Sequence, residues 1–308
     1  MGGGGSFFSE NSNPQNIVGQ LRESEAQTKD QQLDVEVSNI IRSLLVAYND
    51  RDIQAIQTHL NTIKNALNKE LEGTIDILFG GSVAKHTYID GLSDIDTLVL
   101  IDKSELRLMS PTEVKEYLFN KLQARLPKTQ IKQGTLAVTV KFGDVEIQLL
   151  PTIRHESGYQ IADATGKEWS PIKPIEFTSL LTKVNQEAAG KVVPTIKLAK
   201  SIISGLPESQ RLSGYHTEAL AIEIFRQYSG TKKPKDMLQH FFSEASTRVL
   251  NPIKDRTGQS IHVDDYLGSA NSDRRKIVAK SLDRINRRMK NADGAHSVEQ
   301  WHDILDTF

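Results

Sequence analysis

Hydrophobic residues recur every three or four positions across residues 35–71, the spacing that lines one face of a helix. The polar pair Asn49-Asp50 interrupts this pattern, which predicts two consecutive helices instead of one. The same spacing, bounded by proline, glycine or polar residues, predicts more helices further along the chain. These lie at residues 111–126, 176–188, 191–204, 215–228, 234–249 and 273–290.

Apolar runs that are too short for a helix predict strands in the first half of the chain. These strands lie at residues 75–79, 95–101, 136–142 and 145–150. Because the turn residues Gly143-Asp144 separate the last two strands, we expect an antiparallel hairpin there. Proline and glycine are frequent at residues 151–174, which predicts a loop-rich connection.

This order of elements predicts an α+β fold with two lobes. We expect residues 1–34, which begin with a glycine-rich run, to form a flexible N-terminal segment. Residues 35–170 would form a lobe with N-terminal helices and a small mixed β-sheet, and residues 171–308 a mainly helical lobe. A chain of 308 residues is long enough for two closely packed lobes that bury a substantial core.

The composition narrows the possible functions. The chain has no cysteine, which excludes disulfides, iron–sulfur centres and a cysteine nucleophile; its eight histidines are scattered, so we also expect no zinc site. No apolar run approaches the ~18 residues of a membrane-spanning helix, so we expect no membrane insertion. The absence of cysteine fits a reducing compartment, and we expect a cytoplasmic protein.

The charge of the chain is nearly balanced. A net charge of −1 and a pI near 6.7 argue against binding of bulk DNA, so any nucleic-acid site would be a local patch. Lys276, Lys280, Arg284 and Arg288 step by four and form one basic stripe on a predicted helix. A solvated helix face paired with neighbouring acids is the favoured interpretation, and a surface that draws in nucleotides or RNA is the alternative.

The pattern with most chemical content is a glycine–serine turn followed by two aspartates. Gly81 and Ser82 follow the strand predicted at residues 75–79, where a backbone without side chains can approach a ligand closely and donate N–H groups to phosphate. Asp94 and Asp96 stand two apart at the start of the next strand, so period-two geometry places both carboxylates on one face. Such a pair suits Mg²⁺, which prefers one or two protein carboxylates together with substrate phosphates.

This combination resembles the nucleotidyltransferase superfamily that includes DNA polymerase beta. Residues 81–87 with 93–96 resemble more narrowly the bacterial relatives of cyclic GMP–AMP synthase and oligoadenylate synthase, the CD-NTases of antiphage signalling. The resemblance implies a polymerase-beta-like fold with a catalytic lobe and an oligoadenylate-synthase-like helical lobe. It also implies two Mg²⁺ or Mn²⁺ ions, held by the aspartates, and a triphosphate held by the Gly-Ser turn.

The third acidic residue expected from this resemblance departs from the family pattern. In many of these enzymes it stands three residues before a proline, and here that position, counted back from Pro151, is Gln148. A neutral amide is a poorer Mg²⁺ ligand than a carboxylate. Glu146 lies two residues earlier on the same strand face, and its longer side chain could reach the metals. We therefore expect Glu146 to be the third catalytic and metal-binding acid, with Gln148 positioning it or the nucleotide.

Further nucleotide contacts are implied by two later segments. Residues 197–200 resemble the family's spine-helix segment, where a lysine meets the triphosphate, which implies Lys197 and Lys200 as nucleotide-binding residues. The alternative for this pair is a solvated helix face. Residues 214–218 resemble the motif that opens a later helix, which implies that Tyr215 and His216 approach a base or ribose; ordinary packing is the alternative for both.

The resemblance implies a template-independent enzyme that joins nucleoside triphosphates, ATP and possibly GTP, into a cyclic di- or trinucleotide messenger, with an adenine among its bases. Pyrophosphate would leave, a downstream effector protein would bind the product, and an activator protein is a further candidate partner. One alternative is transfer of AMP to RNA, a small molecule or a protein. A second, motivated by Gln148, is a catalytically degenerate nucleotide-binding module.

Overall fold

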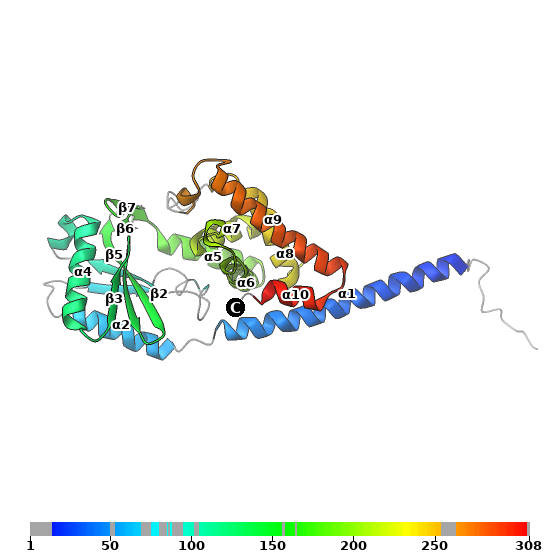
Figure 1. Cartoon of the computed structure of the whole chain (residues 1–308), viewed down its shortest axis with the longest axis horizontal. Coiled ribbons are helices and arrows are strands. Elements are labelled where there is room, and N and C mark those ends of the chain that lie inside the picture. The colour runs from blue at the N-terminus through cyan, green and yellow to red at the C-terminus, as the bar shows by residue number, and fades with distance from the viewer. Residues whose placement is uncertain are drawn as a thin grey trace, which may run out of the picture.

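The chain folds into two lobes with a long N-terminal helix running beside one of them (Figure 1). A computed structural model describes residues 14–49, 53–68, 75–79, 85, 87, 95–101, 105–155, 158–163, 165–253 and 263–306. Among the helices of this described part, none is long and apolar enough to cross a membrane.

A mixed sheet forms the centre of the first lobe. Its strands are β1 (Ile75–Phe79), β2 (Ile95–Ile101), β3 (Gln130–Gln133), β4 (Val138–Phe142) and β5 (Val145–His155). They are ordered β1-β2-β5-β4-β3, and only the pair β2–β5 is parallel among these neighbours. The predicted strands and hairpin are present, and β3 is an additional short strand that its polar sequence did not indicate.

Two helices cover this sheet. Helix α2 (Ile53–Asn68) packs against α4 (Pro111–Arg125) and β1, and its apolar face joins the sheet in one core. Ser110 and Glu113 cap the start of α4 with a reciprocal pair of side-chain-to-backbone hydrogen bonds, and Pro111 begins the helix without needing an N–H partner. The regularly spaced apolar residues of this part of the chain therefore form the core of the sheet lobe.

The connection expected to be loop-rich at residues 151–174 contains regular structure instead. Strand β5 continues to His155 and pairs with β6 (Gly158–Ala162), which pairs in turn with β7 (Trp169–Ile172). Gly158, the first residue of β6, adopts a φ of 145°, a conformation that only glycine takes readily. Pro171 lies in β7, which pairs with β6 alone among the described strands and so tolerates proline, whereas Pro151 lies inside β5 opposite Val99.

The second lobe is helical, as predicted. Its helices are α5 (Pro174–Glu187), α6 (Val192–Ser204), α7 (Gly214–Phe225), α8 (Pro234–Arg248), α9 (Asp273–Gly294) and α10 (Val298–Leu305). Helix α6 lies at the centre, is buried along most of its length and packs against α5, α7, α8 and α10. Strand β7 ends at Ile172 and α5 begins at Pro174, next to the boundary expected at residue 170.

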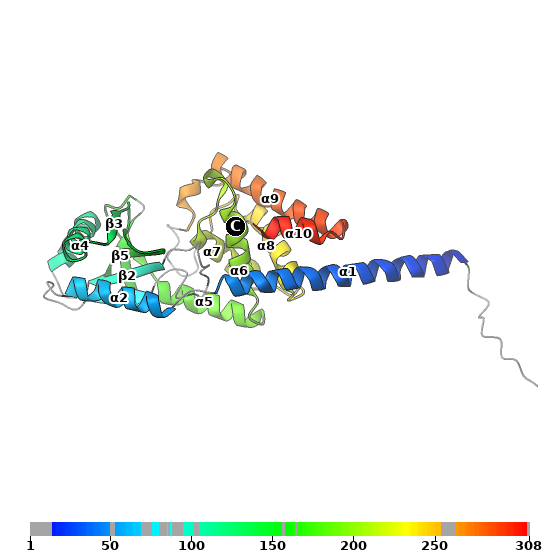
Figure 2. The same ribbon diagram turned by 60° about the horizontal axis from the view of Figure 1, so that its bottom comes forward.

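The N-terminal helix α1 (Pro14–Ala47) corrects two expectations about the first part of the chain. The segment expected to be flexible, residues 1–34, is helical from Pro14 on. In addition, Leu33, Val37 and Ile41 pack into the core of the helical lobe, so α1 does not join the sheet lobe as the division at residues 35–170 implied. The i, i+4, i+8 spacing of these three residues forms the apolar stripe that docks α1. Figure 2 shows the N-terminal half of α1 extending beyond the body of the protein.

Candidate active site

The candidate metal-binding residues lie at one end of β2 and β5. Asp96 is the second residue of β2 and stands directly opposite Gln148 on the parallel strand β5. Register partners on neighbouring strands lie about 4.8 Å apart and share a face of the sheet. Gly81, Ser82 and Asp94 lie outside the described residues, so their roles stay predictions.

Glu146 lies on the same face of β5 as Gln148 and contacts a lysine of the next strand. Its carboxylate accepts a hydrogen bond from Lys141 Nζ at 3.0 Å, and the two residues are register partners between β4 and β5. Both side chains are more than a third exposed, 39% for Lys141 and 38% for Glu146, so this ion pair contributes little to stability. A metal ion could therefore compete with Lys141 for Glu146 at small cost.

The residue types at these three positions are chemically suited to a hard cation. The carboxylates of Asp96 and Glu146 and the amide oxygen of Gln148 are all oxygen ligands, which Mg²⁺ and Mn²⁺ prefer over nitrogen or sulfur. Within the described residues, no group of three or more His, Asp or Glu side chains is assembled into a metal site. The donor chemistry fits the predicted ions, and the assignment of ligands remains a prediction.

A buried ionic cluster lies where the two lobes meet. Lys200 of α6 is only 9% exposed, and its Nζ donates to Glu218 Oε1 of α7 at 2.6 Å. Lys200 Nζ also donates to the backbone carbonyl of Thr87 at 3.2 Å. Glu218, 1% exposed, accepts further hydrogen bonds from Lys85 Nζ and Thr87 Oγ1. The solvated-face alternative for Lys200 is therefore wrong.

Lys85 enters the helical lobe from the sheet lobe. Its Nζ lies 4.8 Å from the ring centroid of Phe177 and 5.0 Å from that of Tyr215, while it pairs with Glu218. The two rings contact each other with centroids 4.8 Å apart. Tyr215 is thus half-buried against Phe177 and Lys85, so packing and a cation–π contact account for its position.

The charges of this cluster keep the carboxylate ionised. Burial alone would raise the pKa of Glu218, but the positive charges of Lys85 and Lys200 outweigh burial and lower the pKa of this carboxyl to about 2. Two ammonium groups face one carboxylate, so the cluster keeps a net positive charge. A buried positive charge beside the segment that follows the Gly-Ser turn is suited to an anionic ligand.

Lys197, the other predicted spine-helix lysine, points elsewhere. It is 4% exposed, and its Nζ donates to the Asn49 side chain at 2.5 Å, immediately after α1. Burial and, to a smaller extent, the charge of Lys200 lower the pKa of Lys197 to about 8. The structure therefore separates the two lysines, one joining the interlobe cluster and the other the end of α1.

His216 lies inside the helical lobe. Its ring is fully buried, and its Nδ1 lies 3.0 Å from the Tyr266 hydroxyl. Burial lowers the pKa of His216 to about 4, so the ring is neutral at pH 7. Its Nε2 has no hydrogen-bond partner among the described residues. This environment favours the packing alternative over a contact with a base or ribose.

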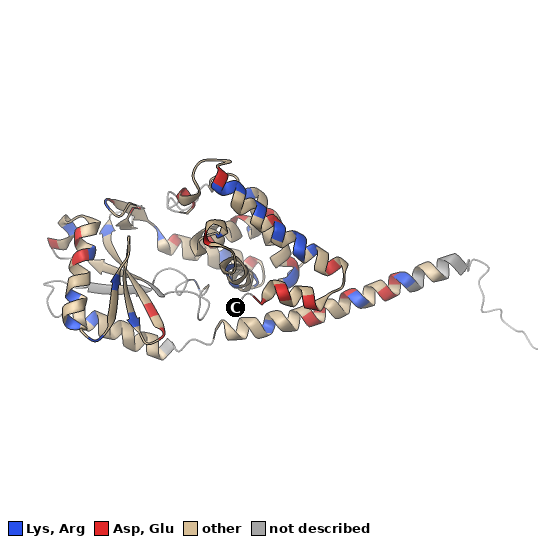
Figure 3. Ribbon diagram, viewed as in Figure 1, with Lys and Arg blue, Asp and Glu red and all other residues tan. Residues whose placement is uncertain are grey.

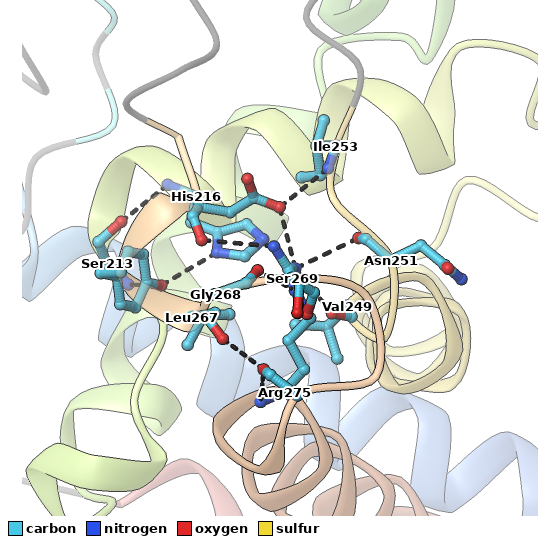
Figure 4. A network of polar contacts seen from close by, with 12 residues as sticks. Ser213, His216, Val249, Asn251, Ile253, Leu267, Gly268, Ser269 and Arg275 are labelled. Atoms are coloured by element: carbon cyan, nitrogen blue, oxygen red, sulfur yellow. Dashed lines mark hydrogen bonds and ion pairs between the residues drawn. The ribbon is translucent and has the colours of Figure 1, made fainter.

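Next to His216, the buried side chain of Arg275 organises the loop before α9 (Figure 4). The guanidinium pairs with Asp264 at 3.0 Å, and Asp264 in turn accepts a hydrogen bond from the backbone N–H of Ile253. Arg275 also donates to the backbone carbonyls of Val249, Asn251, Asp264, Gly268 and Ser269. This network stabilises the helical lobe and uses Asp264 as a structural partner.

The basic stripe lies on the exposed face of α9 (Figure 3). Lys276 pairs with Asp273 at 3.7 Å, while Arg284 and Arg288 donate to the side chain of Gln210 and the backbone carbonyl of Asp303. These contacts with acidic and polar neighbours match the interpretation of a solvated helix face.

Sequence reasoning missed the partners of Lys200. Lys85, Thr87 and Glu218 were part of the recognised motifs, but no role was predicted for them. Glu218 lies in a largely apolar helix, α7, whose remaining residues are mostly buried. An isolated acid within an apolar helical segment must find a buried cation, and that signal could have pointed to a lysine partner.

Comparisons with known proteins agree with this architecture. A family model described as "Second Messenger Oligonucleotide or Dinucleotide Synthetase domain" matches residues 35–185. This match spans α2, the whole sheet and the start of the helical lobe. No curated protein sequence gives a significant match to the chain.

Solved structures resemble nearly the whole chain. Escherichia coli MS115-1 CdnC in complex with HORMA-deltaN has a TM-score of 0.66 at 16% identity, covering 85% of this chain and 92% of CdnC. Bradyrhizobium diazoefficiens CD-NTase CdnG in complex with GTP has a TM-score of 0.64 at 12% identity, covering 89% and 95%. Escherichia coli DncV in its 3'-deoxy GTP bound form has a TM-score of 0.62 at 9% identity, covering 97% and 90%. The predicted fold is confirmed.

Proposed function

We propose that this chain, whose residues 35–185 match the Second Messenger Oligonucleotide or Dinucleotide Synthetase domain and whose fold resembles solved CD-NTase structures, is a template-independent nucleotidyltransferase. It joins nucleoside triphosphates into a cyclic di- or trinucleotide that contains adenine. The product acts as a second messenger in antiphage defence by binding a downstream effector protein. An activator protein is a further partner in this proposal.

The observation that carries the proposal is the register between β2 and β5. Asp96, the second residue of β2, is the register partner of Gln148 on the parallel strand β5, and Glu146 stands two residues before Gln148, so these three positions lie at the same end of the sheet. The lysine-rich cluster around Glu218 lies between this lobe and the helices. Nucleoside triphosphates as substrates are supported by related structures, since CdnC is described with ATP and CdnG with GTP.

In the proposed mechanism, Asp94, Asp96 and Glu146 would hold two Mg²⁺ or Mn²⁺ ions. When bound, these ions supply positive charge that stabilises the attacking and leaving oxygens of an in-line displacement. Gly81 and Ser82 bind the triphosphate through backbone N–H groups and a hydroxyl.

The remaining residues orient the nucleotides. Lys200 contacts the triphosphate tail, and Lys197 joins it by exchanging its Asn49 partner. Tyr215 and His216 support the site from the helical lobe by packing. An acceptor ribose hydroxyl attacks the donor α-phosphorus; the new O–P bond forms as the bond to pyrophosphate breaks, and the hydroxyl proton moves to one of the carboxylates. A second round of the same chemistry, with the linear product turned round, closes the ring.

Product analysis tests this function. The purified protein is incubated with radiolabelled ATP, GTP, CTP and UTP, singly and together, with Mg²⁺ or Mn²⁺, and the products are treated with phosphatase. We expect a phosphatase-resistant species whose mass gives the ring size and bases. Label transfer only after an acceptor is added would instead support AMP transfer. Metal-dependent binding of ATP without turnover would support the degenerate module that Gln148 suggests.

A further inference from the structure

Glu218 receives hydrogen bonds from both lobes on one buried carboxylate. Its Oε2 accepts from Lys85, and its Oε1 accepts from Thr87 Oγ1 and from Lys200 Nζ at 2.6 Å. Lys85 and Thr87 belong to the chain between β1 and β2, whereas Lys200 and Glu218 belong to α6 and α7. The carboxylate is therefore the common acceptor of three donors from two separate parts of the fold.

The ammonium group of Lys200 contacts Thr87 as well as Glu218. Besides Glu218, its Nζ donates to the Thr87 backbone carbonyl at 3.2 Å and contacts Thr87 Oγ1 at 3.3 Å. A methyl group on Gly214 would lie 3.4 Å from Lys200 Cε and 3.5 Å from its Nζ, so the lysine passes close over the start of α7. With three acceptor atoms around Nζ, the position of this ammonium group is set by Glu218 and Thr87 together.

Stability alone does not account for such a cluster. Burying ions costs several kcal/mol each, and replacing a buried ion pair by apolar residues of similar size is often neutral or stabilising. Here two lysines surround one carboxylate, with side-chain exposures of 8%, 9% and 1% for Lys85, Lys200 and Glu218, and leave an excess positive charge. That charge is unfavourable for folding and favourable for binding an anion at the junction of the lobes.

We infer that Glu218 is a positioning residue for the triphosphate: it fixes the ammonium group of Lys200 and holds the Lys85–Thr87 segment against the helical lobe. This inference rests on the proposed function, because the contact between Lys200 and the triphosphate belongs to it. Glu218 does not touch the nucleotide, and it acts through the two lysines. Loss of its carboxylate would weaken triphosphate binding even where folding is preserved.

The test separates a positioning role of Glu218 from a role in stability by including a double variant with the same net charge as the wild type. Glu218→Gln keeps the shape of the side chain but leaves two buried lysines without an acid. Lys85→Met removes one lysine and leaves Glu218 paired with Lys200. The double variant has one lysine and no carboxylate, so its net charge equals that of the wild type. Thermal unfolding without nucleotide and binding of a non-hydrolysable ATP analogue with Mg²⁺ are measured on all four proteins.

We expect Glu218→Gln to lower the Tm by about 5–10 °C, because breaking a buried pair leaves uncompensated charge. The double variant should regain more than half of that loss. Lys85→Met removes one positive charge but keeps Glu218 on Lys200, so it should bind the analogue at least about threefold more tightly than the double variant. The two proteins without the Glu218 carboxylate, Glu218→Gln and the double variant, should bind the ATP analogue more than about tenfold more weakly than the wild type. This is the effect expected for the loss of a charged hydrogen bond.

Three results would overturn the inference. The first is a double variant that regains analogue affinity together with its Tm, which would make the role of Glu218 purely structural. The second is a Lys85→Met protein that binds as weakly as the double variant, which would assign the effect to Lys85. The third is additive Tm losses, which would show that Lys85 and Glu218 are not coupled. Absence of binding to the wild type would overturn the proposed function instead, and the Tm comparison would still decide whether Glu218 links the lobes.

Discussion

Gln148 lies directly across from Asp96 in the parallel ladder between β2 and β5. The residue facing Asp96 is therefore an amide, where the family resemblance leads us to expect a carboxylate. Glu146, on the same face one pleat repeat away, pairs with the partly exposed Lys141 and is free to exchange this partner for a metal ion. The proposed function thus requires Glu146 to supply the third acid.

Substitution of Glu146 tests this requirement. Glu146→Gln should lower turnover by more than about 100-fold, because even the outer partners of metal ligands contribute 10–100-fold. The matched Gln148→Ala change should cost less, since it removes no carboxylate. The measurement is the rate of product formation at saturating metal and nucleotide, with circular dichroism to verify folding. Full activity in Glu146→Gln would assign the third position elsewhere.

The pKa of Lys197 predicts how nucleotide binding depends on pH. Because burial lowers this pKa to about 8, the ammonium group is charged at pH 7 and loses its proton as the pH rises toward 9. A triphosphate contact of Lys197 would therefore weaken across this range. Titration with the non-hydrolysable ATP analogue should show the Kd rising from pH 7 to 9 in the wild type. In Lys197→Met the Kd should be higher at pH 7 and flatter with pH, and an unchanged slope would remove Lys197 from the site.

Arg275 and Arg274 provide a matched pair for the buried network of the helical lobe. Arg275 is 1% exposed and donates to Asp264 and several backbone carbonyls, whereas Arg274 is exposed. Arg275→Lys keeps the charge but loses the planar set of donors, so the free energy of unfolding should fall by about 3 kcal/mol. Arg274→Lys should change it by less than about 0.5 kcal/mol. Urea denaturation measures both, and equal effects would contradict the role of Arg275.

The exposed N-terminal half of helix α1 should be dispensable for the stability of the protein, whereas the half that packs against the helical lobe should be required for it. Residues 22–32 are exposed, whereas Val37 is fully buried in the helical-lobe core. A protein beginning at Asp30 should keep its Tm within about 2 °C, because few contacts are lost. Val37→Ala should lower the free energy of unfolding by about 2 kcal/mol through the cavity that it leaves. A large Tm loss on truncation would show that the exposed half of α1 packs against something in solution.

Much of the fold could be predicted from the sequence because its apolar periods are regular. The break at Asn49-Asp50, the strands around the Asp-x-Asp pair and the long helices of the second lobe all follow from local spacing. Strands β6 and β7 could not be predicted, since glycines and prolines mark loops as well as strand ends. The docking of α1 on the distant helical lobe depends on tertiary packing, which a local pattern does not contain.

Part of the candidate site could likewise be predicted from the sequence, and part could not. The Asp-x-Asp pair and Lys200 are recognisable because each belongs to a short motif within a single local element. The partnership of Lys85 with Glu218, 133 positions apart, depends on how the two lobes meet. His216 and Lys197 were assigned by motif order alone, and local spacing could not show that His216 lies beside Tyr266 or that Lys197 donates to Asn49.

The most direct measurement compares product formation by the wild type, Asp96→Asn and Asp144→Asn. Asp96, the second residue of β2, faces Gln148, whereas Asp144 is an exposed residue of the β4–β5 turn. Both variants make the same chemical change. Each protein is incubated with the four nucleoside triphosphates and Mg²⁺, and phosphatase-resistant products are quantified by mass spectrometry. We predict a cyclic oligonucleotide from the wild type and from Asp144→Asn, and none from Asp96→Asn. Equal product from Asp96→Asn would contradict the proposed catalytic site.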